Sequence, residues 1–194
     1  MRRCPPPPAR IPVLRRLSAR RWLRNDEGSA AIEFAIVALP FFMFVLGIVG
    51  IGLYFLASNS LEYGVEAASR KVRTGEAQKG SSTVDQFKQQ VCDAAGSYID
   101  CSKLSVIVQS ASSWSGISPQ ACVDSNGNMI GSTGSTGDLM SKYTGAASEV
   151  VLVTLCYQWD LATSFTFLNL GKNSDGSGPS IIQAATAFRS EPYQ

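Results

Sequence analysis

The feature that most constrains this chain is a long apolar run close to its N-terminus. No charged residue occurs from Phe34 to Asn59. The apolar part, Phe34–Ala57, exceeds the ~20 residues that a helix needs to cross a bilayer. It is also longer than the 7–15 apolar residues of a secretory signal, and no A-x-A cleavage site follows it. The run therefore predicts a transmembrane helix that stays in the protein as an anchor.

The charges around this run predict its orientation in the membrane. Residues 1–28 contain eight arginines against Asp26 and Glu27, whereas the rest of the chain is acidic. A basic flank beside an apolar span marks the cytoplasmic side. We therefore expect a cytoplasmic arm at 1–28, a helix crossing the inner membrane at 29–58 and a periplasmic domain at 59–194. A nucleic-acid-binding tail is the disfavoured alternative, because the transmembrane run directly follows the arginines.

One carboxylate stands at the entrance to the apolar run. Glu33 lies just before it, where a charge in the bilayer would cost about 2.5–3.5 kcal/mol. Gly28 has no side chain to obstruct a membrane-embedded aspartyl peptidase, and a cut there would give Ser29 a new α-ammonium group. Glu33, one helical turn further on, would then form an ion pair with the ammonium group of a neighbouring subunit. The alternative is an uncleaved chain in which Glu33 faces cytoplasmic water or Arg24.

The predicted helix has irregular residues inside the span and continues beyond it. Pro40 removes a backbone donor and should kink the axis. Gly47, Gly50 and Gly52 could let another helix approach closely. Beyond the span, apolar residues keep a 4-3-4 spacing, which predicts one continuous helix of about 45 residues. These residues are Leu61, Val65, Ala68 and Val72.

The remaining residues predict a small α+β domain. Thr83 opens a capping-box pattern, which predicts a second helix. Strand patterns occur at Leu104–Val108, Val150–Leu161 and Ile181–Arg189, and Asn126-Gly127 predicts a turn in a short hairpin. We expect the fold class α+β, in which the extended transmembrane helix and the second helix pack on a small antiparallel sheet.

Of the five cysteines, one lies near the N-terminus and four lie after the apolar run. Cys4 lies in the cytoplasmic arm, and the other four lie in the predicted periplasmic domain, where the compartment is oxidising. Four cysteines permit three pairings, and nearest-neighbour spacing favours Cys92–Cys101 and Cys122–Cys156. A zinc site is the disfavoured alternative, because the sequence has no histidine and no C-x₂-C pair.

The sequence offers little catalytic chemistry. Without histidine there is no Ser-His-Asp triad and no imidazole base. We also find no phosphate-binding glycine loop and no acidic cluster with metal spacing. We therefore expect no enzyme, no metal, no cofactor and no nucleic-acid partner, and a secreted enzyme remains only a third alternative. The aromatic residues Trp114, Trp159, Phe165 and Phe167 are expected in the core.

Several segments together resemble the TadE-like family of the tight-adherence (Tad/Flp) type IVb pilus system. The most specific one is the opening, where a glycine and small residues precede Ile32, Glu33 and Phe34. The resemblance also includes the following segments: Gly28–Phe42, Ser60–Tyr63, Ala67–Arg70, Arg73–Gln78, Val91–Asp93 with Cys101, and Ala187–Tyr193. Members often carry a second acid within the span, and here Gly50 lies near that place.

The resemblance implies a pseudopilin that supports pilus biogenesis, adhesion and biofilm formation. Its dedicated prepilin peptidase would cut between Gly28 and Ser29, and Glu33 would be the family's fifth-position acid. The implied partners are this peptidase, other Tad pilins or pseudopilins, the inner-membrane assembly platform and the lipid bilayer. The alternative is an uncleaved, signal-anchored periplasmic module that binds a ligand or an envelope partner.

Overall fold

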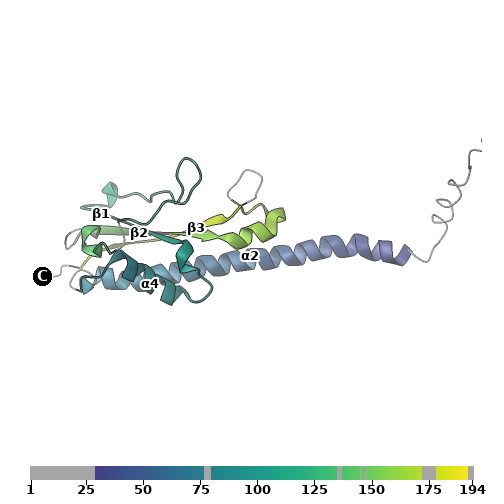
Figure 1. Ribbon diagram of the computed structural model, residues 1–194, viewed down its shortest axis with the longest axis horizontal. Helices are drawn as coiled ribbons and strands as arrows, with labels where there is room; N and C mark the ends of the chain where they lie inside the picture. The colour runs from purple at the N-terminus through teal and green to yellow at the C-terminus, as the bar shows by residue number, and fades with distance from the viewer. Residues whose placement is uncertain are drawn as a thin grey trace, which may run out of the picture. The chain divides into compact units, whose positions relative to one another are not determined.

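The computed structural model describes residues 29–76, 80–134, 137–144, 146, 148–171 and 178–191. The chain divides into two compact units, Met1–Leu46 and Gly47–Gln194. The helix α2 runs from Ser29 to Arg73 without interruption, so the expected continuous helix is confirmed (Figure 1). The expected α+β class is confirmed as well, because a second helix and a three-stranded sheet follow α2.

The second helix, α4, spans Val84–Ala95 and begins where the capping box predicts. The backbone N–H of Gln86 donates to the Thr83 hydroxyl, and the Thr83 N–H donates to the Gln86 side chain. Two donors at the helix start are thereby satisfied. The apolar face of α4 and the 4-3-4 face of α2 are both buried. The α4 residues are Val84, Phe87, Val91 and Ala95, and those of α2 are Leu61, Val65, Ala68 and Val72.

The two helices meet closely because Gly64 of α2 has no side chain. A Cβ atom there would lie 2.8 Å from the backbone oxygen of Val91 and 3.1 Å from the Cβ of Ala95. Even an alanine would therefore collide with the α4 backbone. Gly64 fixes the distance between the helices in the domain core.

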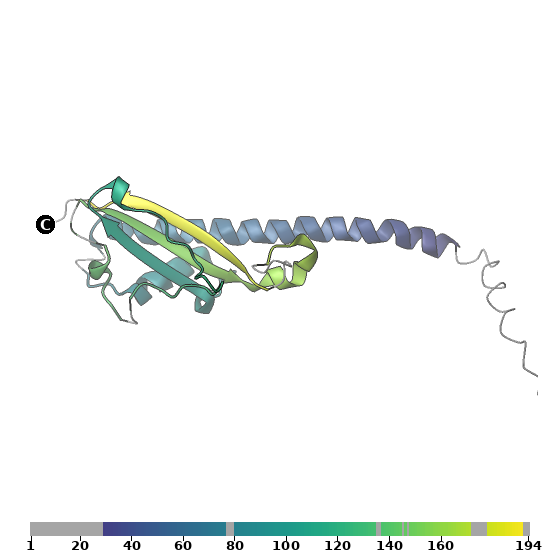
Figure 2. The ribbon, with the colours of Figure 1, turned by 90° about the horizontal axis from the view of Figure 1, so that it is seen from above.

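The sheet is antiparallel with strand order β1-β2-β3. Its strands are β1 (Leu104–Ala111), β2 (Val150–Trp159) and β3 (Ser180–Arg189), and Figure 2 shows them side by side. Side chains alternate between the two faces of a strand, so every second residue of the central β2 joins the core with α2 and α4. These residues are Val151, Val153, Leu155, Tyr157 and Trp159.

The opposite face of the sheet is covered by an irregular segment that a disulfide attaches to β2. Cys122 is bonded to Cys156, and both are buried with Ile107 in a smaller cluster. The Thr133 N–H donates to the Val106 carbonyl at the outer edge of β1. The second disulfide joins Cys92 of α4 to Cys101. Both pairs are those that the spacing favoured.

The short helical turns are where the sequence expectations fail. They are η2 (Cys101–Lys103), η3 (Trp114–Gly116), η4 (Met140–Lys142) and η5 (Asp160–Leu168). The expected strand to Leu161 ends at Trp159, because the chain turns into η5 at Asp160. The expectation that all four aromatic residues lie in the core is also wrong. Trp159 is buried, but Trp114 and Phe167 are 58% and 43% exposed because they lie on η3 and η5, outside the packed layers.

Candidate functional site

The N-terminal part of α2 presents apolar side chains to its surroundings in every direction. The side chains of Ile32, Phe34 and Ile36 are all more than 60% exposed. Among the described residues, α2 is the one helix long and apolar enough to cross a membrane. An apolar surface of this extent is unstable in water and marks a membrane or protein contact.

The residues predicted for processing lie at the start of α2. Gly28 falls outside the described residues, and Ser29 is the first residue of the helix. Glu33 lies one turn further on and is exposed. Its side chain therefore lies on the exposed surface of the helix. Cleavage and pairing remain predictions.

Pro40 lies inside α2, and the helix continues past it to Arg73. A proline at this position cannot donate to the carbonyl four residues earlier, and such gaps are tolerated in transmembrane helices. The predicted kink remains a prediction.

At two of the three glycines in the span, side chains of η5 from the same chain pack against α2. A Cβ atom on Gly50 would lie 2.8 Å from Leu168 Cδ1 and 2.9 Å from Phe165 Cδ1. On Gly47 it would lie 3.6 Å from Leu168 Cδ2, whereas a Cβ atom on Gly52 would meet no other part of the described structure within 4 Å. The surface at Gly47 and Gly50, expected to be open for another helix, is thus occupied within the same chain. Sequence reasoning missed η5, because its residues lie more than 100 positions away.

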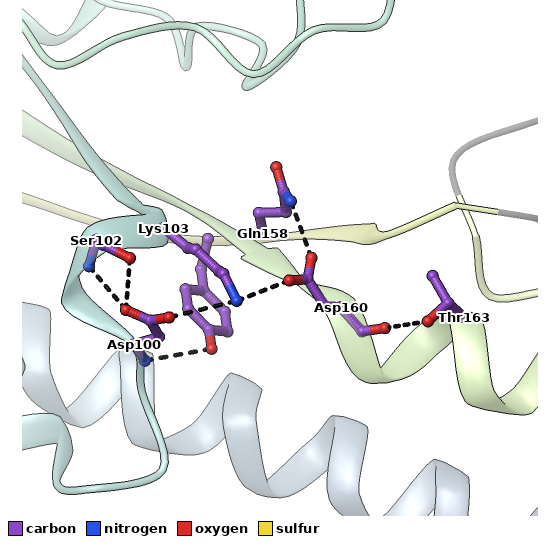
Figure 3. Close-up of polar contacts among 7 residues, drawn as sticks. Asp100, Ser102, Lys103, Gln158, Asp160 and Thr163 are labelled. Carbon is purple, nitrogen blue, oxygen red and sulfur yellow. Dashed lines mark hydrogen bonds and ion pairs between the residues drawn. The ribbon is translucent and has the colours of Figure 1, made fainter.

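A charged cluster holds the start of η5 (Figure 3). The ammonium group of Lys103 lies 2.7 Å from a carboxylate oxygen of Asp160 and 3.3 Å from one of Asp100. The Gln158 side-chain amide donates to the other Asp160 oxygen at 2.8 Å. The Thr163 hydroxyl donates to the Asp160 carbonyl at 2.8 Å. The end of β2 and the start of η5 are thereby tied to η2.

These contacts shift the acid–base behaviour of the cluster. The hydrogen bond from Lys103 and then that from Gln158 hold the pKa of Asp160 below its usual value. The hydrogen bonds from the Ser102 hydroxyl and N–H lower the pKa of Asp100. Asp160 and then Asp100 raise the pKa of Lys103. The cluster is therefore fully charged near neutral pH, and its role is to position the chain.

We predict that the cluster makes the domain less stable in acid. A carboxylate whose folded pKa is lowered adds stability above its unfolded pKa of ~3.9, and this stability is lost as the pH falls through the folded pKa. The unfolding temperature of the detergent-solubilised protein should therefore fall below about pH 4, by a few degrees at most, because the Lys103, Asp100 and Asp160 side chains are 37%, 49% and 45% exposed and solvent screens their ion pairs. Asp160→Asn should reduce this fall in unfolding temperature at low pH, whereas Glu62→Gln, on the exposed surface of α2, should leave it unchanged. The same fall in unfolding temperature in Asp160→Asn would contradict the stabilising role of the cluster.

The described part of the chain shows no cluster of three or more His, Cys, Asp or Glu residues that could hold a metal ion. An open groove of about 510 Å³ lies between α2 and β3, lined by Tyr63, Glu66, Ala67, Ser69, Arg70, Arg73, Thr186, Ala187 and Phe188. The Ser69 hydroxyl is buried there and has no hydrogen-bond partner among the residues that the structure describes. The sequence analysis did not predict this groove, because its two walls are far apart in the chain. They come together only when β3 pairs with β2 and thereby lies beside α2.

These features define a class: a single-pass membrane-anchored protein whose long helix carries a disulfide-bonded α+β domain. Within this class, residues 28–70 match the model of the TadE-like protein family. The match confirms the resemblance over residues 28–70, and it begins at Gly28 itself. Comparison with curated proteins and with solved structures found no match to this chain.

Proposed function

We propose that this protein is a pseudopilin of a Tad (Flp) pilus system, cut after Gly28 and assembled through α2. The observation that carries the proposal is the family match over residues 28–70, which covers the cleavage motif and most of α2. The exposed apolar surface of α2 supports it, because such a helix can rest in a bilayer and later pack against other helices. The proposal involves no catalysis by this chain.

In this proposal the N-terminal arm is cytoplasmic and the α+β domain is periplasmic. The prepilin peptidase removes residues 1–28, and Ser29 then carries a new positive charge. Glu33 pairs with such a charge on a neighbouring subunit, where an unpaired charge in an apolar bundle is costly. The partners are other pilins or pseudopilins and the inner-membrane assembly platform. The assembled system supports adhesion and biofilm formation.

The alternative function is an uncleaved, membrane-anchored binding module. The groove between α2 and β3 favours it, because Arg70, Arg73 and Ser69 line the groove and the Ser69 hydroxyl has no hydrogen-bond partner within the described ranges. Such a groove suits a polar ligand or an extended peptide. In that case the arginine-rich arm would remain on the mature protein.

The N-terminus of the mature protein distinguishes the two functions. We expect N-terminal sequencing of the membrane-extracted protein to begin at Ser29 when the prepilin peptidase is present and at the original start when it is deleted. Gly28→Val should abolish the cut, because a branched side chain blocks access to the scissile carbonyl.

The matched control is Gly52→Val, which adds the same bulk to α2 where none of the described residues would contact the new Cβ atom within 4 Å. This variant should be cut as the unchanged protein is. An arm that stays intact in both strains would refute the pseudopilin route and favour the binding module.

A further inference from the structure

We propose that η5 inserts its exposed apolar side chains into the outer leaflet of the bilayer, beside α2. Lipid acyl chains contact this surface of η5, and the domain thereby rests against the membrane. The proposal rests on membrane anchorage by α2, and it needs neither the cut at Gly28 nor assembly into a pilus.

The position of η5 along α2 is fixed by close packing. Phe165 and Leu168 contact Gly50, where no Cβ atom would fit without movement. Leu168 and Phe167 also lie within 4 Å of the Cβ position on Gly47. The η5 segment therefore lies at the level of Gly47 and Gly50.

This level falls inside the bilayer. The hydrocarbon core is about 30 Å thick and takes ~20 helical residues. Counted from Phe34, the first residue after the charged Glu33, the core ends close to Leu53. Since a helix rises about 1.5 Å per residue, Gly47 and Gly50 lie roughly 5–10 Å below the outer edge of the hydrocarbon. A segment packed on these glycines must lie at the same depth.

The composition and exposure of η5 suit that depth. No charged residue occurs from Leu161 to Gly171. Leu161 and Phe167 are 49% and 43% exposed, and Ile48 and Ile51 of α2 are exposed as well. The lipid-facing surface of α2 is thus continuous in chemistry with that of η5. A depth of ~5–10 Å is also typical of amphipathic segments that lie in the membrane interface.

The residues just before η5 have the chemistry of a membrane–water boundary. Trp159 packs edge-on against Tyr54 of α2, with ring centroids 5.6 Å apart. Tryptophan and tyrosine concentrate at the headgroup level of membrane proteins. Asp160, the first residue of η5, follows Trp159 directly and pairs with Lys103 of η2, and this charged pair would lie among polar headgroups. Charged residues therefore give way to apolar ones at the depth where polar headgroups give way to hydrocarbon.

The test is a depth measurement on the full chain in vesicles of phosphatidylethanolamine and phosphatidylglycerol. In a Cys4→Ser background, a nitroxide label is attached at Phe167→Cys, and its collisions with apolar oxygen and with a water-soluble nickel chelate are compared. We expect the ratio of oxygen to nickel collisions to be several-fold higher at position 167 than at Trp114→Cys. Both positions are exposed, and Phe165 and Leu168, which hold η5 against Gly50, stay unchanged in the labelled variants.

A label at Phe44→Cys reports on the anchor itself, because this side chain is exposed on α2. Lipid contact at 44 and water contact at 167 would overturn the proposal while leaving the anchor intact. Water contact at 44 would refute the anchor and the proposal together. A label at 167 that is shielded from both reagents would show that protein covers η5, and this too would overturn the proposal.

Discussion

Replacing Gly64 with leucine should destabilise the domain by about 3 kcal/mol or more, and Gly64→Ala by about 1–2 kcal/mol. The reason is the contact between α2 and α4, where a Cβ atom would lie 2.8 Å from the Val91 backbone oxygen. A backbone atom within a helix cannot move aside as the end of a side chain can. Domains of this kind are stable by only ~5–15 kcal/mol. Thermal unfolding of the full chain in detergent, followed by near-ultraviolet circular dichroism, measures the loss.

Gly52→Ala is the matched control for this prediction. Gly52 lies in the same helix, and in the part of the chain that the structure describes no packing atom lies within 4 Å of the position its Cβ would take. Alanine favours helix over glycine by about 1 kcal/mol, so this variant should unfold at the same temperature as the original protein or slightly higher. An unfolding temperature of Gly64→Leu equal to that of Gly52→Ala would show that the helices do not depend on this contact.

Removing the disulfide between Cys122 and Cys156 should cost about 4 kcal/mol, close to the upper end for one cross-link. Its cysteines are 34 positions apart, against 9 for Cys92 and Cys101. A longer closed loop restricts the unfolded chain more, so the second pair should contribute only about 2.5 kcal/mol. Both sulfur atoms of the first pair also fill the small cluster with Ile107.

Two double variants, Cys122→Ala/Cys156→Ala and Cys92→Ala/Cys101→Ala, test this ranking. Urea unfolding should give a lower midpoint for the first than for the second. Intact-mass analysis should confirm that the remaining disulfide is formed. A larger loss from the Cys92/Cys101 variant would contradict the loop-length argument and place the greater effect in the packing of α4.

The sequence predicted those elements whose cause is local. The continuous helix to Arg73 follows from unbroken 3.6-residue spacing, and the start of α4 follows from hydrogen bonds between Thr83 and Gln86. The strands follow from alternating or β-branched runs. In each case the residues that specify the element are neighbours in the chain, so a pattern is sufficient.

The errors have a common physical origin. Val150–Leu161 reads as one strand because Leu161 is apolar, but the Asp160 carboxylate is bound by Lys103 and Gln158 and the chain turns there. Phe167 reads as a core residue for the same reason, yet it lies exposed on η5. Apolar character predicts removal from water, and it does not say whether protein or lipid will cover the side chain.

The sequence by itself determined the membrane anchor, the helix that continues from it, the α+β class and the candidate processing motif at Gly28 and Glu33. It did so because charge, apolar length and helical spacing act between neighbouring residues. Only the tertiary structure decided that Gly64 receives the α4 backbone and that Gly50 receives Phe165 and Leu168. These contacts join residues far apart in the chain, and a glycine in the sequence does not show which atom will occupy the space it leaves.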